Sequence, residues 1–227
     1  MRIVCSVLTF LLAVPAADVL AADQQGPAPQ IANGLERVPN ARVNLAYVKP
    51  GTDWSKYRTI ELRTLQVPQK VRNAAPNGAS PEFGESYVLR DEDVTALQNA
   101  YATAMRSHLT NAGYTFVDKP GADTLIVVAQ IINIKLAAPV ESSRPGFTGG
   151  GLTVSPGGGT MTIAAAFADG ATGQEIAEAA DQYAPVSVWG INNSVANLAE
   201  ARQGFDKWAS ELVDRLTEQS GSNNPIN

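Results

Sequence analysis

The most regular pattern of apolar positions lies between Asp91 and Gly113. Apolar residues recur there at three- and four-residue spacing, which is typical of an amphipathic helix with one buried stripe: Val94, Leu97, Tyr101, Ala104, Met105 and Leu109. Asp91, Glu92 and Asp93 place negative charge at the start, where the helix dipole favours it, and Asp91 can cap the free amides. Gly113 can adopt a positive φ and end the helix. The pattern predicts a helix over residues 91–112.

A second stripe with the same spacing predicts a closing helix from near Asn197 to about Gln219. Its apolar face consists of Leu198, Phe205, Trp208, Ala209, Leu212 and Leu216. Glu200 follows Asn197 at the spacing of a capping box. Gly204 inside this helix costs about 1 kcal/mol relative to alanine. We interpret Gly204 as a site of close packing against a sheet.

Alternation of apolar and polar residues predicts the strands. The longest runs from Thr124 to Leu136, and its first half is apolar on both faces, as in a central strand beneath helices. In its second half the residues expected to face inward are Ile132, Ile134 and Leu136. Thr160–Ala168 and Gln174–Tyr183 alternate on either side of the turn 169–173, which predicts a hairpin.

Two shorter strands are expected at Tyr114–Val117 and Thr59–Val67, the second with a slip in phase that a bulge would explain. Because two amphipathic helices need an apolar surface to cover, the fold class is α+β. We expect a mainly antiparallel sheet of about four to five strands, covered on one face by the two helices. A single domain over residues 43–219 would follow a flexible leader, 23–42, and precede a disordered tail, 220–227.

The amino-terminal residues have the pattern of a secretory signal peptide. Arg2 provides positive charge, an apolar run follows, and small residues suit cleavage near Ala21 or Ala22. The run is shorter than the roughly 20 residues of a membrane span, although an uncleaved anchor is the alternative. Cys5 lies too early in the run to be a lipidated cysteine and would be removed with residues 1–22. The expected location is the periplasm, with no transmembrane segment in the mature chain.

Four segments resemble a bacterial family of unknown function, the lipoprotein-like domain-of-unknown-function family 3313. They are PGTDWSKYRTIEL, LTNAGYTFVDKPGADTLIV, GTMTIAAAFADGATGQEIAEAADQ and FDKWASELVDRL. The resemblance spans roughly residues 46–218 and implies an envelope protein of Gram-negative bacteria, often lipid-anchored, without an established activity. This chain departs from that pattern because it lacks a lipidation cysteine. The family supplies no catalytic residues to carry over.

Composition excludes several classes of protein. The 227 residues hold 17 Lys and Arg against 22 Asp and Glu, and this acidic balance disfavours a nucleic-acid binder. One His and one Cys cannot form a zinc site of several such residues or a disulfide framework. Residues 37–90 hold nine basic and four acidic residues. This segment could face an anionic envelope surface, or its charges could simply be scattered and solvated.

Individual candidates for chemistry have ordinary structural explanations. His108 is expected to interact with the end of its helix rather than act as a general base. The glycine-rich stretch 146–159 lies between strands and holds no basic residue, so it predicts a loop rather than a phosphate site. Asp91, Glu92 and Asp93 point in different directions, and Asp169 suits a turn. We therefore assign no catalytic, cofactor-binding or metal-binding residue and expect no cofactor.

We expect an exported envelope protein that acts as a non-catalytic binding or assembly module. The long irregular segments 69–86 and 137–159 are places where recognition commonly resides, and another envelope protein is a candidate partner. The alternative is a hydrolase of envelope polymers with a site assembled from residues far apart in the sequence. A pocket that gathers carboxylates with perturbed pKa values would favour the hydrolase.

Overall fold

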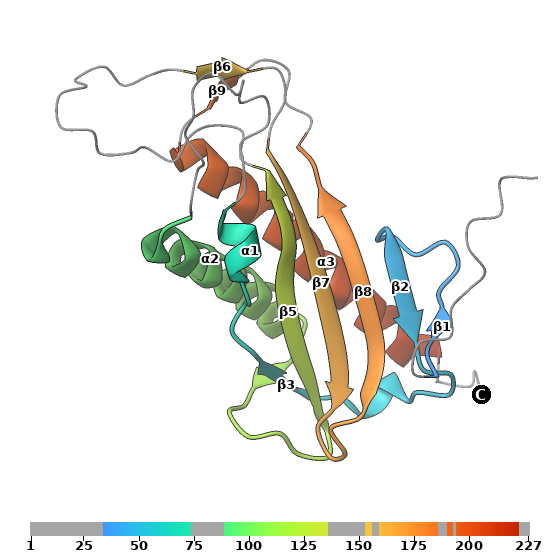
Figure 1. The fold of residues 1–227 in the computed structure, drawn as a ribbon. Helices are drawn as coiled ribbons and strands as arrows, with labels where there is room; N and C mark the ends of the chain where they lie inside the picture. The colour runs from blue at the N-terminus through green and yellow to red at the C-terminus, as the bar shows by residue number, and fades with distance from the viewer. Residues whose placement is uncertain are drawn as a thin grey trace, which may run out of the picture. The chain divides into compact units, whose positions relative to one another are not determined.

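The computed structural model describes residues 34–73, 89–135, 153–155, 159–185, 190–192 and 194–222, which belong to one compact unit. The predicted signal peptide and most of the segment 137–159 lie outside the described residues. The elements are β1 Glu36–Arg37, β2 Leu45–Val48, the 3-10 helix η1 Trp54–Lys56, β3 Thr59–Leu62, α1 Gln69–Arg72, α2 Asp91–Asn111, β4 Thr115–Phe116, β5 Thr124–Lys135, β6 Thr153–Ser155, β7 Thr160–Asp169, β8 Glu175–Tyr183, β9 Gly190–Asn192 and α3 Ser194–Ser222 (Figure 1).

The main sheet has seven strands in the order β1-β2-β8-β7-β5-β3-β4. The pairs β1–β2, β2–β8, β8–β7 and β7–β5 are antiparallel, whereas β3 is parallel to both β5 and β4. The predicted α+β class is confirmed, but a mainly antiparallel sheet of four or five strands is inexact. The long connection that contains α2 returns the chain to the same end of the sheet, so β3 pairs in parallel. The strand predicted at Tyr114–Val117 is present as β4, whereas β1 and β2, of two and four residues, were not predicted because they are too short to show a clear period.

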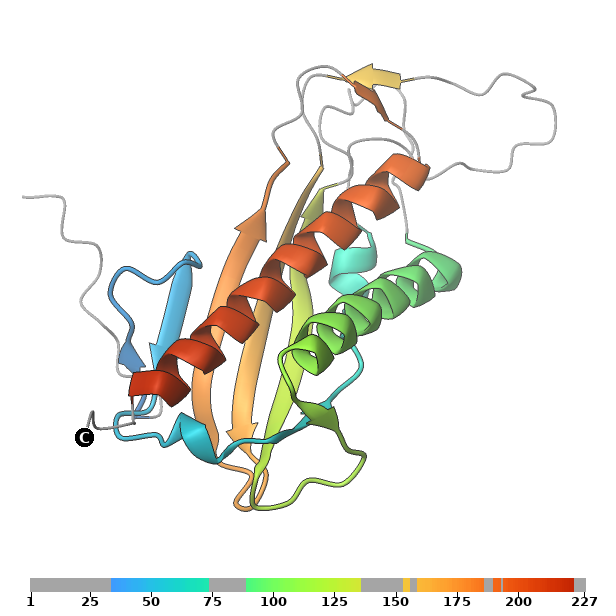
Figure 2. The same cartoon turned by 180° about the vertical axis from the view of Figure 1, so that it is seen from behind.

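The two long helices lie together on one face of the sheet, as Figure 2 shows. The predicted helix at 91–112 is confirmed as α2, and its apolar stripe is buried. Ring contacts link α2, α3 and β8: Tyr101 meets Phe205, Phe205 meets Trp208, and Trp208 meets Tyr183, all edge to face. This series of aromatic contacts joins α3 both to α2 and to β8.

The start of α2 differs in detail from the prediction. Arg90 is the N-cap, and the Asp93 carboxylate accepts a hydrogen bond from the Arg90 backbone amide at 2.9 Å. Asp91 is not the cap, because its carboxylate pairs with Arg72 of α1 at 2.7 Å. The acidic first turn therefore caps its own helix through Asp93 and ties α1 to α2 through Asp91.

The closing helix begins earlier than predicted. Since α3 starts at Ser194, Glu200 lies beyond the first turn and is not a capping-box partner. Its carboxylate accepts a hydrogen bond from the Gly159 amide instead. The interpretation of Gly204 is confirmed: a Cβ there would meet the Tyr183 ring of β8 at 3.1 Å, so glycine allows close packing.

Strand β5 contains an irregularity that reverses one predicted orientation. The register with β7 shifts between Ile131 and Asn133, which turns Ile132 outward and leaves it 40% exposed. Ile134 is buried as predicted. A bulge inserts one residue into one strand, and this explains why simple alternation fails at Ile132.

The sheet also begins earlier than the sequence predicts. Residues 36–37 pair with β2, and Leu35 just before them is 1% exposed. Part of the expected flexible leader is thus built into the sheet. The loop between β1 and β2 lies over the carboxyl-terminal half of α3, to which Arg42 is joined by ion pairs.

Candidate functional site

Four alanines form one row across the face of the sheet that the helices cover. Ala46 of β2 lies opposite Ala179 of β8, Ala179 lies opposite Ala165 of β7, and Ala165 lies opposite Ala129 of β5. Residues directly opposite each other point to the same face. Three strand spacings of about 4.8 Å make this row about 14 Å long.

A cavity of about 380 Å³ lies above this row. All four alanines line it, and α3 covers it with Trp208, Leu212 and Leu216. The larger inward side chains at its ends come from β5, β7, α2 and η1: Val127, Ile163, Phe167, Tyr101, Met105 and Trp54. The lining is therefore mainly apolar.

Small side chains explain why the space stays open. Ala165 and Ala179 are only half-buried although they lie on the covered face. Beside them Phe167 and Val127, which lie opposite each other, carry larger side chains that are buried and line the cavity. Core interiors normally contain few voids larger than a water molecule, so the alanine row is the cause of this one.

The cavity reaches the surface between the β1–β2 loop and α3. Exposed Arg37 of β1 and exposed Pro39 and Arg42 of this loop belong to the lining. The Arg42 guanidinium pairs with Asp214 at 2.6 Å and with Glu218 at 2.7 Å. These pairs hold the loop against α3, although each partner is about half exposed and the pairs contribute little stability.

Asp181 marks the polar end of the cavity. Its buried carboxylate accepts hydrogen bonds from the Asn44 amide at 2.9 Å and from Lys207 Nζ and Trp208 Nε1 at 2.8 Å each. Burial alone would raise the pKa of Asp181, but these hydrogen bonds outweigh it and lower the pKa. Asp181 is thus an ionised anchor that joins β2, β8 and α3.

Among the residues that the structure describes, two polar atoms of the lining residues have no hydrogen-bond partner. They are the Tyr101 hydroxyl and Glu211 Oε2, both buried. Glu211 Oε1 pairs with Lys207 at 2.9 Å, so only one oxygen of this carboxylate is satisfied. Burial raises the pKa of Tyr101. A buried polar atom without a partner costs about 1–3 kcal/mol of stability.

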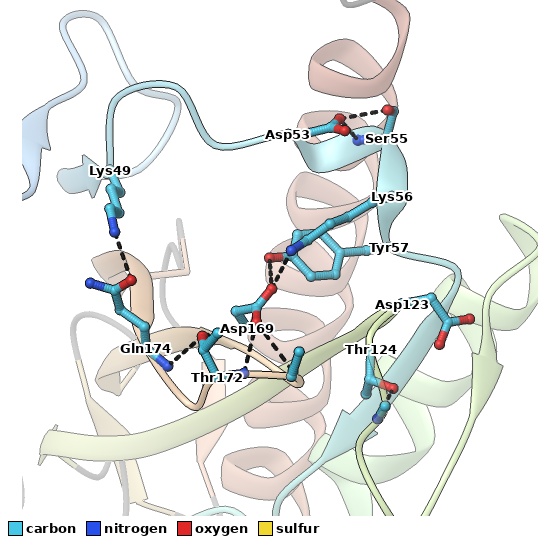
Figure 3. Close-up of polar contacts among 12 residues, drawn as sticks. Lys49, Asp53, Ser55, Lys56, Tyr57, Asp123, Thr124, Asp169, Thr172 and Gln174 are labelled. Carbon is cyan, nitrogen blue, oxygen red and sulfur yellow. Dashed lines mark hydrogen bonds and ion pairs between the residues drawn. The ribbon is translucent and has the colours of Figure 1, made fainter.

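The second polar cluster surrounds Asp169 at the hairpin turn between β7 and β8. Figure 3 shows Lys56, Tyr57 and Thr172 converging on its carboxylate. Backbone amides of Ala171 and Thr172 also donate to it. Burial opposes ionisation, but the hydrogen bonds prevail and hold the pKa of Asp169 well below its usual range. Every oxygen is engaged, so this cluster stabilises the turn, in agreement with the predicted role of Asp169.

Several basic side chains of residues 37–90 form ion pairs within the protein. Besides Arg42 and Arg72, Lys56 pairs with Asp169 and Arg63 pairs with Glu61. His108 lies at the end of α2, 3.5 Å from Asp206 of α3, and does not line the cavity. Arg42, Lys56 and Arg72 thus pair with acidic residues from outside 37–90, whereas the partner of Arg63 lies within that segment.

Sequence reasoning missed the cavity, although one signal was present. Alanine occupies inward positions in three predicted strands, yet alternation treats alanine as one more apolar residue. Only the registers of β2, β8, β7 and β5 place these alanines on one row.

The described residues contain neither a membrane-spanning helix nor a group of side chains placed to bind a metal ion. No helix of that part of the chain combines the length and apolar character needed to cross a membrane. Within the same residues, no group of three or more His, Cys, Asp or Glu side chains is placed to hold a metal ion.

Several solved structures have a similar arrangement at low sequence identity. A Xanthomonas campestris protein with the family model DUF330 is 12% identical, with a TM-score of 0.41, covering 78% of this chain and 95% of that one. The PelC dodecamer of Paraburkholderia phytofirmans is 9% identical, with a TM-score of 0.37, covering 74% and 95%. A putative neuraminyllactose-binding hemagglutinin homolog of Helicobacter pylori is 9% identical, with a TM-score of 0.40, covering 73% and 86%. We draw no functional conclusion from likenesses this weak.

The sequence comparisons give a family but no activity. No curated protein matches the chain. The family model described as "Protein of unknown function (DUF3313)" matches residues 32–212, which includes all seven strands of the sheet, both long helices for most of their length, and the residues that line the cavity up to Leu212. The chain therefore belongs to the DUF3313 family of proteins of unknown function, as the four segments of its sequence suggested.

Proposed function

We propose that this protein is an exported, non-catalytic binding module of the bacterial envelope, and that its ligand site is the cavity between the alanine row and α3. One observation carries the proposal: an apolar space of about 380 Å³ inside an otherwise packed domain. Pockets that bind small molecules have volumes of about 300–1,000 Å³ and mostly apolar linings with a few polar groups.

The arrangement of charges favours binding over hydrolysis. A general acid would need a carboxyl group whose pKa is raised toward neutrality. The pKa of Asp181, the most buried carboxylate at the cavity, is lowered instead, and its oxygens accept from Asn44, Lys207 and Trp208. The pKa of Glu175 is raised to about 7, but Glu175 does not line the cavity. A carboxylate in this state positions its neighbours and does not transfer protons near neutral pH.

Export is supported by the amino-terminal pattern of charge, apolar run and small residues that ends near Ala21 or Ala22. Mass spectrometry of the protein from fractionated cells tests this part. We expect a periplasmic protein whose first residue follows Ala21 or Ala22. A cytoplasmic protein that begins at Met1, or an acyl group on Cys5, would contradict it.

Binding is tested with N-phenyl-1-naphthylamine, a neutral apolar probe whose fluorescence rises in an apolar environment. We expect the purified protein to enhance its fluorescence in a saturable manner. The double variant A165L/A179L fills the centre of the row and is expected to weaken probe binding at least about tenfold, or 1.4 kcal/mol. The matched control is A166L on the opposite face of β7, which is expected to bind like the unchanged protein. Equal probe binding by A165L/A179L and the unchanged protein would refute the cavity as the site.

A further inference from the structure

We propose that two copies of this protein pair through the face of the sheet opposite the helices, about a two-fold axis that runs along the strands between β5 and β7. Figure 1 views the sheet from this side, with α2 and α3 behind the strands. The surface is not the cavity, so this inference stands apart from the proposed function. Three features lead to it: the apolar character of the face, its relief, and the charges at the two ends of one row.

The face is more apolar than a sheet surface that meets only water. The solvated face of an antiparallel sheet normally carries the polar residues of the alternation. Here β5, β7 and β8 present mainly apolar side chains to it: Ile126, Val128, Ala164, Ala166, Ala168 and Ala180. Val128 is 38% exposed, and Ile132 of the same strand is 40% exposed. A contiguous apolar patch of this kind marks an interaction site.

The relief of two neighbouring strands is self-complementary. At three successive positions an alanine of β7 lies opposite a larger side chain of β5: Ala168 and Ile126, Ala166 and Val128, and Ala164 and Gln130. Strand β5 therefore forms a ridge and β7 a trough. A two-fold axis midway between them lays the ridge of each copy over the trough of the other. Val128 of each copy then packs on Ala166 of the other.

The row that contains Val128 and Ala166 ends in opposite charges. Glu178 of β8 lies opposite Ala166 on one side. On the other side Arg63 follows the last residue of β3, and its amide donates to the Val127 carbonyl at 2.9 Å, which places Arg63 beside Val128. Across the four strands the row thus reads acid, small, large and base.

The same two-fold axis reverses this order in the second copy. Glu178 of each copy then faces Arg63 of the other, and the two ion pairs form together with the apolar contacts. Arg63 already pairs with Glu61 at 2.7 Å, and Glu61 lies opposite Ile126 on this face. A guanidinium has five N–H donors, so Arg63 can bind a second carboxylate.

The extent of the face is sufficient for a dimer of modest affinity. Four strands about 4.8 Å apart overlap, and β7 has 10 residues of about 3.4 Å each, which gives about 650 Å² for each copy, or about 1,300 Å² in total. Specific interfaces bury about 1,200–2,000 Å². Since the central row holds no aromatic anchor, we expect a dissociation constant of about 10–100 μM. Protein at about 1 μM is then monomeric, and unfolding measured at that concentration reports on the single copy.

Sedimentation velocity of the purified protein from about 1 to 200 μM tests the association. We expect a shift from monomer to dimer across this range. V128K places a charge on the ridge and should weaken the dimer at least about tenfold. The matched control T103K adds the same charge to an exposed position of α2, and it should associate like the unchanged protein. A monomer at every concentration, or a dimer that V128K and T103K affect equally, would overturn the inference.

Charge reversal tests the two-fold arrangement without depending on V128K. E178R alone places two arginines together at each end of the row, and R63E alone places two glutamates there, so each variant should dimerise at least about tenfold more weakly. In an equimolar mixture, a dimer of one E178R copy and one R63E copy restores an opposite charge at both ends. We expect the mixture to associate at least about tenfold more tightly than either variant alone, with unchanged circular dichroism. A mixture as weak as its components would overturn the arrangement.

Discussion

Replacing Ala165 with leucine is the most direct test of whether the alanine row leaves real space. Ala165 lies at the centre of the row, on β7, and lines the cavity. In a fully packed core a larger side chain forces neighbours out of place and destabilises the protein by about 1–3 kcal/mol. In an open cavity the same side chain gains burial without strain. The two situations therefore predict opposite signs.

The expected gain follows from the chemistry of the side chain. Leucine adds three carbon atoms to alanine, and burial of each contributes about 0.8 kcal/mol, or about 2.4 kcal/mol in all. Fixing the leucine rotamer costs about 0.5–1 kcal/mol. The net expectation for A165L is a stabilisation of about 1.5 kcal/mol. For a domain of this size, that corresponds to a rise in Tm of about 3–6 °C.

Urea titration followed by circular dichroism measures the effect as a change in midpoint at constant m-value. Ala166 provides the control, because it is the next residue of the same strand and belongs to the uncovered face. A166L shares the change in strand propensity but fills no cavity, so it should change stability by less than about 0.5 kcal/mol. If A165L destabilises the protein by 1 kcal/mol or more while A166L does not, the row is tightly packed and the reasoning fails.

Three further predictions concern the hairpin that bears the cavity floor. D169N should lower the free energy of unfolding by about 2 kcal/mol at neutral pH. Because folding lowers the pKa of Asp169 from its ordinary value of 3.8, this loss should be complete above that pH and should shrink progressively as the pH falls below it, as urea titrations across pH would show. G170A should destabilise the protein more than G173A in the same assay, because a Cβ on Gly170 would lie 2.5 Å from a backbone oxygen. At Gly173 a Cβ would meet open space, and only the φ of 69° disfavours alanine, so an equal effect of the two variants would argue against the close approach at Gly170. Burial and then the neighbouring Glu178 raise the pKa of Glu175 to about 7, so the free energy of unfolding should fall as the pH rises from about 4.5 to 7. E175Q should remove this part of the pH dependence, and parallel plots of stability against pH for E175Q and the unchanged protein would contradict the prediction.

Local patterns in the sequence were sufficient for the principal elements. The three- and four-residue spacing predicted α2 almost to the residue, and alternation predicted the hairpin of β7 and β8 with its turn at Asp169. Gly204 indicated the close approach of α3 to the sheet, which the contact with Tyr183 confirms. These features depend on residues near one another in the chain, where helix and strand periods act directly.

Features that depend on distant contacts were missed or misplaced. The outward turn of Ile132 follows from a bulge that only the pairing with β7 defines. Strand β1 has two residues and exists because β2 is beside it. The carboxylate of Asp91 pairs with Arg72 of α1 and does not cap α2, because α1 lies within its reach. In each case a partner remote in sequence outweighed the local preference.

The amino-acid sequence by itself determined where the helices and the long strands form, and it placed alanine at inward positions of separate strands. Only the tertiary structure decided that Ala46, Ala179, Ala165 and Ala129 fall on one row beneath α3. The register of a strand against its neighbour is set by the whole sheet, and a slip of one residue would turn each alanine to the other face. The cavity is therefore a property of the assembled layers, because it forms where the small side chains of this row come to lie beneath α3.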